Sequence, residues 1–395
     1  MVEGRTALST FIAERLRARN DVSRSFFPRE APRLAEASRR MAERFLEGGR
    51  LLAFGRGPYA TDARHVSVEF VHPVIVGKRA LPALDLGPAF EHSLPALVTP
   101  QDMVMGFGPP GGDPLVTRAL DVAAARGALT FALPGASGDY AVAAPSDDPF
   151  LHQEMIEILY HTLWETVHVF LEHREMGHDV GASGFLYPFL GETGADTGAL
   201  LEDVAASIVM KARDDERLRE TVAETHAGAM AEAAAAIHER LRAGGRLLLF
   251  GNGGSATDAN DWALDAVMPP PGRPALPALS LAAEPAILTA VANDVGVEVL
   301  FLRQLIAHAR PKDVAIGIST SGGSKNIVVA LEEARRRGML TAALLGYDGG
   351  EIARRGLADH ALIVPSDYVP RIQEAQASMY HTLMESLYVL IDEQD

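Results

Sequence analysis

The sequence predicts an α/β fold of two tandem domains, each a doubly wound parallel sheet flanked by helices. The first observation is an internal repeat: residues 48–71 match residues 244–267 without a gap, and residues 153–172 match residues 373–392. A repeat of this size is a whole domain and not a solenoid unit. The second observation is that short apolar runs alternate with helical patterns in both copies. This alternation is typical of a parallel sheet that is covered on both faces.

Each copy is expected to open with two helices, to continue with five strands and to end in one long helix. The first copy has helices at 11–20 and 33–47, strands at 51–54, 80–86, 103–107, 129–133 and 141–144, and a closing helix at 153–172. The second copy has helices at 200–213 and 218–243, strands at 247–250, 275–281, 314–319, 341–345 and 360–364, and a closing helix at 373–392. An additional helical segment is expected at 282–311. The repeat predicts domains at 1–176 and 198–395, joined by a Gly- and Pro-containing linker at 177–197.

The composition excludes several classes of function. The 395 residues include 52 acidic and 36 basic side chains, for a net charge of −16, which argues against a nucleic-acid partner. The sequence has no cysteine, so any metal must be held by His, carboxylate or amide ligands. No apolar stretch is long enough to span a membrane, and the N-terminal residues do not resemble a secretory signal. We therefore expect a cytoplasmic protein without a membrane partner.

The glycine turn at 251–254 is the first candidate for ligand binding. It follows the apolar run at 247–250 and precedes a helix, so free backbone N–H groups and the positive end of the helix dipole point into one hollow. Asn252 lies in the turn, Ser255 adds a hydroxyl group, and Ser255 and Thr257 are candidate N-caps. The alternative is an ordinary turn between a strand and a helix.

A second loop of the same copy is rich in hydroxyl groups. Ser319, Thr320, Ser321 and Ser324 follow the strand at 314–318, at the carboxyl end where open α/β sheets bind ligands. Hydroxyls with helix N-terminal amides suit a phosphate monoester, and the missing P-loop lysine argues against a nucleoside triphosphate. The alternative is a serine-rich loop that only caps a helix. The first copy has lost these hydroxyls, and Asp113 takes the place of Ser324 and would repel a phosphate.

The first copy retains a different set of side chains. His65 and Glu69 lie four residues apart on one helix face, and Gln153 and His161 lie on the closing helix. Two imidazoles, a carboxylate and an amide oxygen could bind zinc or another divalent ion, or Glu69 and His161 could be a general base and acid. The structural alternatives are a surface pair and a core histidine. The corresponding residues of the second copy are Asp261, Asp265, Gln373 and His381.

The stretches GNGGSATDANDWALD, VANDVGVE, GISTSGGSKNIVVALEEARRRGM and RIQEAQASMYHTL resemble the SIS (sugar isomerase) domain, in the phosphoheptose isomerase branch. The resemblance covers essentially all of the second copy and, more faintly, the first. It implies phosphate binding by five hydroxyl residues, namely Ser255, Ser319, Thr320, Ser321 and Ser324. It implies that Asn293 and Asp294 line the sugar site. The family has an acidic residue where Pro370 stands, so one polar contact is missing.

The resemblance also implies an activity and its catalytic residues. The family converts D-sedoheptulose 7-phosphate to D-glycero-D-manno-heptose 7-phosphate through an enediol. The resemblance assigns the base to Glu69 or Asp265, the acid to His161 or His381, and a zinc site to His65, Glu69, Gln153 and His161. Gln373 and His381 match that set in the second copy. Because the family is tetrameric with sites that use more than one chain, it implies composite use of the two copies and a homodimer of this chain.

Two other functions remain open at the level of sequence. One is a non-catalytic protein that binds a sugar phosphate as a regulator or scaffold. The replacement of His65 by Asp261 in the second copy and the lost hydroxyls of the first copy favour it, whereas the His65, Glu69, Gln153 and His161 set of the first copy opposes it. The other is a different aldose–ketose isomerase or a sugar-phosphate lyase, because a fold with a phosphate site does not determine the sugar.

Overall fold

The protein contains two five-stranded parallel sheets, as seen in a computed structural model that describes residues 2–74, 77–175 and 197–393. Contacts divide the chain into two compact units. Unit 1 comprises Met1–Asn20 and Asp215–Asp395, and unit 2 comprises Asp21–Asp214. The predicted domains at 1–176 and 198–395 follow the sequence repeat, whereas the units follow contacts. The two divisions differ because each unit includes helical residues from the other sequence copy. The predicted linker lies outside the described residues except for its last residue, Thr197.

The two sheets have the same strand order. Unit 2 has the order β2-β1-β3-β4-β5, with β1 (Leu51–Gly55), β2 (Ala83–Asp85), β3 (Met103–Phe107), β4 (Leu129–Leu133) and β5 (Tyr140–Ala141). Unit 1 has the order β7-β6-β8-β9-β10, with β6 (Leu247–Phe250), β7 (Ala278–Ser280), β8 (Val314–Ser319), β9 (Leu340–Leu345) and β10 (His360–Ile363). All neighbouring strands are parallel, which confirms the predicted fold class.

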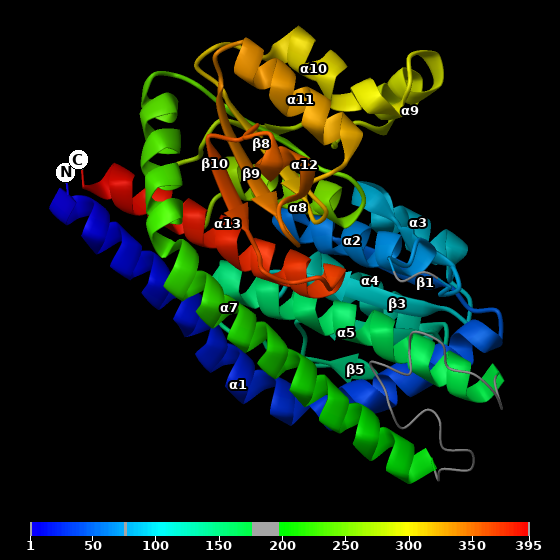
Figure 1. The fold of residues 1–395 in the computed structure, drawn as a ribbon. Helices are drawn as coiled ribbons and strands as arrows, with labels where there is room; N and C mark the ends of the chain where they lie inside the picture. Colours follow the sequence, from blue (N-terminus) through cyan, green and yellow to red (C-terminus); the bar gives the residue numbers. More distant parts are fainter. Residues whose placement is uncertain (1, 75–76, 176–196, 394–395) are drawn as a thin grey trace. The chain divides into compact units, whose positions relative to one another are not determined.

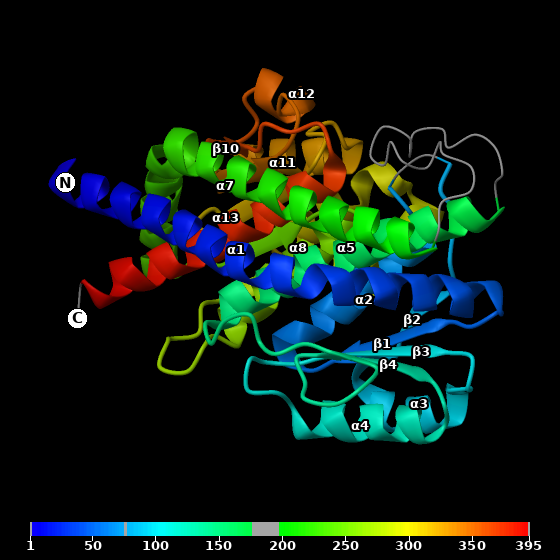
Figure 2. The same ribbon diagram turned by 90° about the horizontal axis from the view of Figure 1, so that it is seen from below.

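Helices cover both faces of each sheet, which explains why the central strands are apolar along their whole length. In unit 2, α2 (Ala60–Val71) packs on one face, and α3 (Phe90–Leu97) and α4 (Pro114–Ala125) lie on the other, as Figure 2 shows. In unit 1, Figure 1 shows α10 (Leu300–His308) and α11 (Lys325–Arg336) above β8 and β9. The helix α8 (Gly254–Val267) packs against β6, β7 and β8.

Two long helices replace the four opening helices that the sequence predicts. They are α1 (Val2–Leu46) and α7 (Thr197–Arg242), drawn in blue and green in Figure 1. Pro28 and Pro32 lie inside α1, where proline normally ends a helix. Phe26 and Phe27 are fully buried beside them, and this packing offsets the lost backbone hydrogen bonds.

The two long helices each pass from one unit into the other. The first twenty residues of α1 belong to unit 1 and its remainder to unit 2. The helix α7 begins in unit 2 and enters unit 1 at Asp215. Each unit is therefore completed by a helical segment from the other sequence copy.

The remaining elements agree closely with the prediction. The closing helices are α5 (Pro149–Glu175) and α13 (Val369–Asp392). The additional segment of the second copy forms α9 (Pro285–Asp294), η4 (Val297–Val299) and α10, where the first copy has only η2 (Gly87–Ala89) and α3. The short elements are η1 (Gly57–Tyr59) and α12 (Gly350–Arg354). Among the described residues, no helix has both the length and the apolar character needed to cross a membrane.

Candidate active site

The strand order places the candidate loops of unit 1 next to each other. The order reverses between β6 and β8, and ligands of open α/β sheets bind at the carboxyl ends of the strands on either side of such a reversal. Phe250 at the end of β6 pairs in register with Gly317 of β8. The glycine turn after β6 and the serine loop after β8 therefore open at the same point of the sheet edge.

The glycine turn depends on two of its glycines. A Cβ atom at Gly251 would lie 2.2 Å from the carbonyl oxygen of Ser255, and Gly253 has a φ of +56°. Gly253 is the N-cap of α8 and makes no side-chain cap, so the expectation that Ser255 or Thr257 caps this helix is wrong. The hydroxyl of Thr257 instead donates to the Gly254 carbonyl at 2.5 Å, because α8 begins at Gly254 and both hydroxyls lie inside the helix.

Two asparagines join the glycine turn to the serine loop. Asn252 Nδ2 donates to Asn326 Oδ1 at 2.9 Å, and Asn326 Nδ2 donates to Asn252 Oδ1 at 2.8 Å. Asn326 lies in the first turn of α11, directly after the loop. The reciprocal pair holds the two loops together at the end of β6 and β8, and the repeat pattern alone did not identify Asn326.

The hydroxyls of the serine loop shape a backbone that only glycine permits. Ser319 Oγ accepts from the Gly322 amide at 3.1 Å, and Gly322 has a φ of +60°. Ser321 Oγ accepts from the Gly323 amide at 3.3 Å. Ser324 is the N-cap of α11, but its side chain makes no capping hydrogen bond and lies 3.5 Å from Ser319 Oγ. A helix N-terminus with uncapped amides and nearby hydroxyls is a suitable place for a phosphate.

The other predicted residues of the sugar site lie apart from this hydrogen-bonded network. Asn293 and Asp294 are exposed at the end of α9. Asn293 Nδ2 donates to Asp294 Oδ1 at 2.7 Å. The half-buried Thr320 lies in the serine loop, where its carbonyl oxygen accepts from the Gly346 amide at 2.9 Å.

The corresponding loop of unit 2 is closed by its own carboxylate. Asp113 is the N-cap of α4, and its Oδ1 atom accepts from the amides of Leu115 at 2.8 Å and Val116 at 3.2 Å. Arg56, in the position of Asn252, contacts Asp113 Oδ2 at 3.1 Å. The Asp113 carboxylate thus takes the helix amides that a phosphate would use, and Arg56 balances its charge.

The histidine and carboxylate set of unit 2 comes together in a buried cluster. His65 and Glu69 lie on α2, and His161 lies on α5. His161 Nε2 is 3.3 Å from His65 Nε2, and His65 Nε2 is 3.8 Å from Glu69 Oε1. The ligand atoms of these three residues all lie within 4.8 Å of one another, so the cluster could hold a metal ion. The fourth predicted ligand, Gln153, contacts Thr61 and Asp62 in the first turn of α2, each at 3.4 Å.

Unit 1 has a related cluster that is richer in carboxylates. His381 Nε2 on α13 lies 3.0 Å from Asp265 Oδ2 and 3.6 Å from Asp261 Oδ2, both on α8. These three residues also satisfy the geometry for a metal ion, which the sequence reasoning did not predict for them. Gln373 is buried on the same helix, and its Oε1 atom has no hydrogen-bond partner among the residues that the structure describes.

Two tyrosines of α13 were missed by the sequence reasoning. Tyr380 donates to Asp261 Oδ2 at 2.6 Å and thereby fixes that carboxylate. Tyr388 is buried close to Asp265: burial raises the pKa of Tyr388, and the Asp265 charge raises it further, whereas Arg273 opposes the shift. The repeated tripeptide Tyr-His-Thr, at 160–162 and 380–382, was the available signal for Tyr380.

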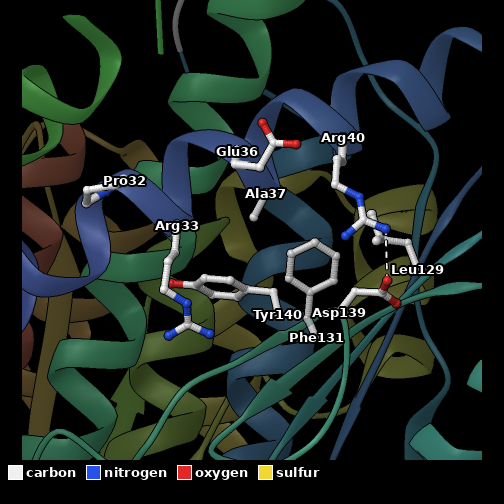
Figure 3. Close-up of a pocket in the computed structure, with 9 residues that line it drawn as sticks. All are labelled: Pro32, Arg33, Glu36, Ala37, Arg40, Leu129, Phe131, Asp139 and Tyr140. Carbon is white, nitrogen blue, oxygen red and sulfur yellow. Dashed lines mark hydrogen bonds and ion pairs between the residues drawn. The ribbon is translucent and has the colours of Figure 1, made fainter. Parts of the chain in front are cut away.

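A cavity of about 320 Å³ lies elsewhere in unit 2, between α1 and strands β4 and β5, and is drawn in Figure 3. Arg40 Nη2 donates to Asp139 Oδ1 at 2.8 Å across its rim. The guanidinium of Arg33 lies 5.2 Å from the centre of the Tyr140 ring. The predicted site residues are not among those that line this cavity, so it is separate from the candidate active site.

The sequence is similar to a known domain family and to known enzymes. A family model described as a SIS domain matches residues 213–346. The phosphoheptose isomerase of Geobacter sp. (strain M21) is 46% identical over 162 residues, which are 40% of this chain and 81% of that protein. The phosphoheptose isomerase of Pelobacter propionicus is 44% identical over 191 residues, which are 47% of this chain and 96% of that protein.

One solved structure is similar in fold along most of the chain. It is the C-terminal domain of glucosamine-fructose-6-phosphate aminotransferase from Francisella tularensis, with a TM-score of 0.57 and 10% sequence identity. The match covers 92% of this chain and 93% of that one. The sequence relatives thus have the length of one repeated half, whereas the fold likeness extends over both sheets.

Proposed function

The chain belongs to the SIS family, in its phosphoheptose isomerase branch, and on this premise we propose that it interconverts D-sedoheptulose 7-phosphate and D-glycero-D-manno-heptose 7-phosphate. It is a sugar-phosphate isomerase. The observation that carries the proposal is the pair of loops at the ends of β6 and β8, tied by Asn252 and Asn326 and lined with hydroxyls.

Phosphate binding is assigned to unit 1. Ser319, Ser321 and Ser324 supply hydroxyl donors around the N-terminus of α11, and Ser255 adds one from the first turn of α8. Thr320, Asn252 and the exposed pair Asn293 and Asp294 are proposed to contact the substrate. Charge-assisted hydrogen bonds from several fixed donors hold one end of the open-chain sugar. The rest of the sugar is then held in one orientation toward the acid and base. The entropy of orienting the sugar is lost on binding and no longer adds to the barrier of the reaction step.

The isomerisation moves one proton between C1 and C2 through an enediol, and it needs a base at carbon and an acid at oxygen. Two carboxylate–histidine pairs have the necessary chemistry: Glu69 with His161 in unit 2, and Asp265 with His381 in unit 1. We assign the main base to Glu69, because it belongs to the set that retains two histidines. Asp265, the corresponding carboxylate of unit 1, accepts a hydrogen bond from His381 at 3.0 Å and is the second candidate base.

A zinc ion fits the cluster of unit 2. Two imidazole nitrogens bound tetrahedrally, each about 2.0–2.1 Å from zinc, lie roughly 3.3 Å apart, and His65 Nε2 and His161 Nε2 are separated by 3.3 Å. Glu69 supplies a carboxylate oxygen, and Gln153 is the proposed fourth ligand. A divalent ion held by these residues would stabilise the negative charge of an enediol oxygen. The residues of the chain orient the sugar and transfer the proton.

The test is isomerisation of D-sedoheptulose 7-phosphate by the purified chain, with and without a chelator, together with metal analysis. We expect turnover that is lost on chelation and restored by zinc. If there is no turnover, while the phosphosugar still raises Tm, the protein is a sugar-phosphate-binding regulator or scaffold and the proposal is wrong. Turnover of a different phosphosugar only would retain the isomerase and exclude the heptose substrate.

We also propose a homodimer, because two copies of this chain supply the four SIS domains of the family's tetramer. Light scattering of the purified protein measures the mass directly. A mass of twice 42.2 kDa is expected, and a monomer would contradict this proposal without affecting the isomerase assignment.

A further inference from the structure

An ion pair stands one helical turn after the histidine of each closing helix. In unit 2, Glu165 follows His161 by four residues on α5, and its carboxylate is bonded to the ammonium of Lys211 on α7. The side chains of Glu165 and Lys211 are 1% and 6% exposed. Residues four apart on a helix lie on the same face, so this pair is adjacent to the proposed acid.

Unit 1 repeats the arrangement with arginines. Glu385 follows His381 by four residues on α13 and accepts a hydrogen bond from Arg15 Nε at 2.9 Å. The fully buried Arg19 lies 3.4 Å from the other oxygen of Glu385. Arg15 and Lys211 occupy corresponding positions of the repeat, as do Glu165 and Glu385. The same link is therefore present twice.

The cation of each pair comes from the helix segment that is exchanged between the sequence copies. Arg15 lies in the first copy but in unit 1, and Lys211 lies in the second copy but in unit 2. We propose that these exchanged segments position the reaction histidines, so that Lys211 sets the register of α5 at His161 and Arg15 with Arg19 sets α13 at His381. These are positioning residues, and the proposal rests on the isomerase function stated above.

The physical reason is the cost of an unpaired buried charge. Removing one partner of a buried ion pair is strongly destabilising, because it leaves an uncompensated charge away from water. A helix rises 1.5 Å and turns about 100° per residue, so a slip of α5 by one residue would both break the pair and turn His161 away from His65. At present His161 Nε2 and His65 Nε2 are 3.3 Å apart. The pair therefore penalises the helix positions that would separate the reaction groups.

The test removes the pair in unit 2 without leaving a lone charge, in the double variant Lys211→Met/Glu165→Met. The matched control is Arg17→Met/Glu220→Met, an exposed ion pair that joins α1 and α7 and does not involve a closing helix. The reversed pair Lys211→Glu/Glu165→Lys is the rescue. Each is measured for kcat, KM and Tm in the full chain. The imidazole resonances of His161 and His381 are assigned with His161→Gln and His381→Gln.

The Met variant is expected to lower kcat by about 10- to 100-fold, with KM within twofold, because a small misplacement of a reacting group affects the rate and not phosphate binding. The His161 resonance should move and the His381 resonance should not, and the reversed pair should restore both kcat and the resonance. A folded Met variant with unchanged kcat and an unchanged His161 resonance would overturn the proposal. If the Met variant does not fold, Lys211→Gln/Glu165→Gln is judged by the same criteria.

The resonances separate this proposal from the proposed function. If the unaltered chain has no isomerase activity, the proposed function fails, and the His161 resonance still reports whether Lys211 and Glu165 hold that side chain. If the unaltered chain is active, and the Met variant has the same kcat and the same His161 resonance, only the positioning role is refuted.

Discussion

Unit 1 and unit 2 share a sheet and differ at the ends of its central strands. In unit 1 the two loops are joined by the neutral pair Asn252 and Asn326, and the N-cap Ser324 leaves the helix amides available. In unit 2 the loops are joined by the ion pair of Arg56 and Asp113, and the Asp113 carboxylate occupies the amides. The helix N-terminus of unit 1 is therefore available to an external anion, whereas that of unit 2 already binds the Asp113 carboxylate.

The difference shows which contacts a duplicated domain must keep. Arg50 donates to Asp102 in unit 2 and Arg246 donates to Asp313 in unit 1, each at 2.8 Å. These pairs connect neighbouring strand ends and are the same in both units. Loop residues at the carboxyl ends of the strands changed instead, because they support ligand binding and contribute less to the core.

The largest expected effect comes from deleting residues 1–20, which belong to unit 1 although they lie in the first sequence copy. The deletion removes the buried side chains of Leu8, Ile12 and Leu16, each worth roughly 1.5–3 kcal/mol, and the partners of Glu385. The free energy of unfolding of unit 1 should fall by about 5 kcal/mol or more. Hydrogen exchange should accelerate in β6, β8 and β9 and not in β1, β3 and β4. Equal acceleration in both sheets would contradict the assignment of residues 1–20 to unit 1. A synthetic peptide of residues 1–20, added to the shortened chain, should restore the slow hydrogen exchange of unit 1.

The second expected effect concerns the base. Glu69→Gln should lower kcat by about 100- to 10,000-fold, the range for loss of a general base, and Asp265→Asn should lower it less. Both variants are neutral amides of nearly the same size, so Tm serves as the control for folding. The reverse order would move the proton-transfer step to unit 1 and would make unit 2 a structural partner.

A third variant introduces the aspartate N-cap of unit 2 into the corresponding position of unit 1. Ser324→Asp should place a carboxylate on the amides of α11 and beside the phosphate, and like charges in contact cost several kcal/mol. We expect phosphosugar binding, measured by calorimetry, to weaken by about 100-fold or more. The reciprocal variant Asp113→Ser should leave the binding constant of unit 1 within twofold. Tight binding by Ser324→Asp would show that the phosphate is held elsewhere.

The smallest expected effect is the pH dependence of stability that one histidine of unit 2 contributes. His152 donates to the Gly108 carbonyl at 3.0 Å, and unit 1 has Ile372 at the corresponding position. Burial lowers the pKa of His152 to about 4, although the hydrogen bond opposes the shift. The unfolded chain, with a pKa near 6.5, binds this proton first. Stability is therefore complete above pH 6.5 and is lost as pH falls toward 4.

At pH 5 this amounts to about 2 kcal/mol relative to pH 8. Urea unfolding of the native chain and of His152→Leu at both pH values measures it, and the difference between the two proteins removes the contribution of other histidines. Equal pH dependence in the two proteins would show that His152 is protonated in the folded state.

Much of the fold could be predicted because it depends on local patterns. The apolar runs at 103–107, 129–133 and 314–319 are strands with those bounds, since a strand buried on both faces must be apolar throughout. The strand expected at 141–144 is instead Tyr140–Ala141, since only two residues pair with β4. The helix breaks expected near Pro28 are absent from α1, because tertiary packing overrides local propensity.

The site could be predicted where spacing alone brings residues together. His65 and Glu69 share a helix face, and the repeat identified the closing helix that carries His161. The cluster of these three residues could therefore be predicted from the sequence. The carboxylate cap by Asp113 and the asparagine pair depend on loop conformation. The exchange of helix segments depends on contacts between residues as distant as Arg15 and Glu385. Sequence patterns contain no information on such long-range packing.

The exchanged segments have a consequence for the order in which the protein forms during synthesis. Domains generally fold as units while the chain is still being made. Unit 2 is complete once Asp214 has left the ribosome, about halfway through the chain. Residues 1–20 precede unit 2 in the chain, yet their partners Glu385 and α13 follow it. Residues 1–20 must therefore wait, attached to a folded unit 2, until α13 has been synthesised, and unit 1 can close only then.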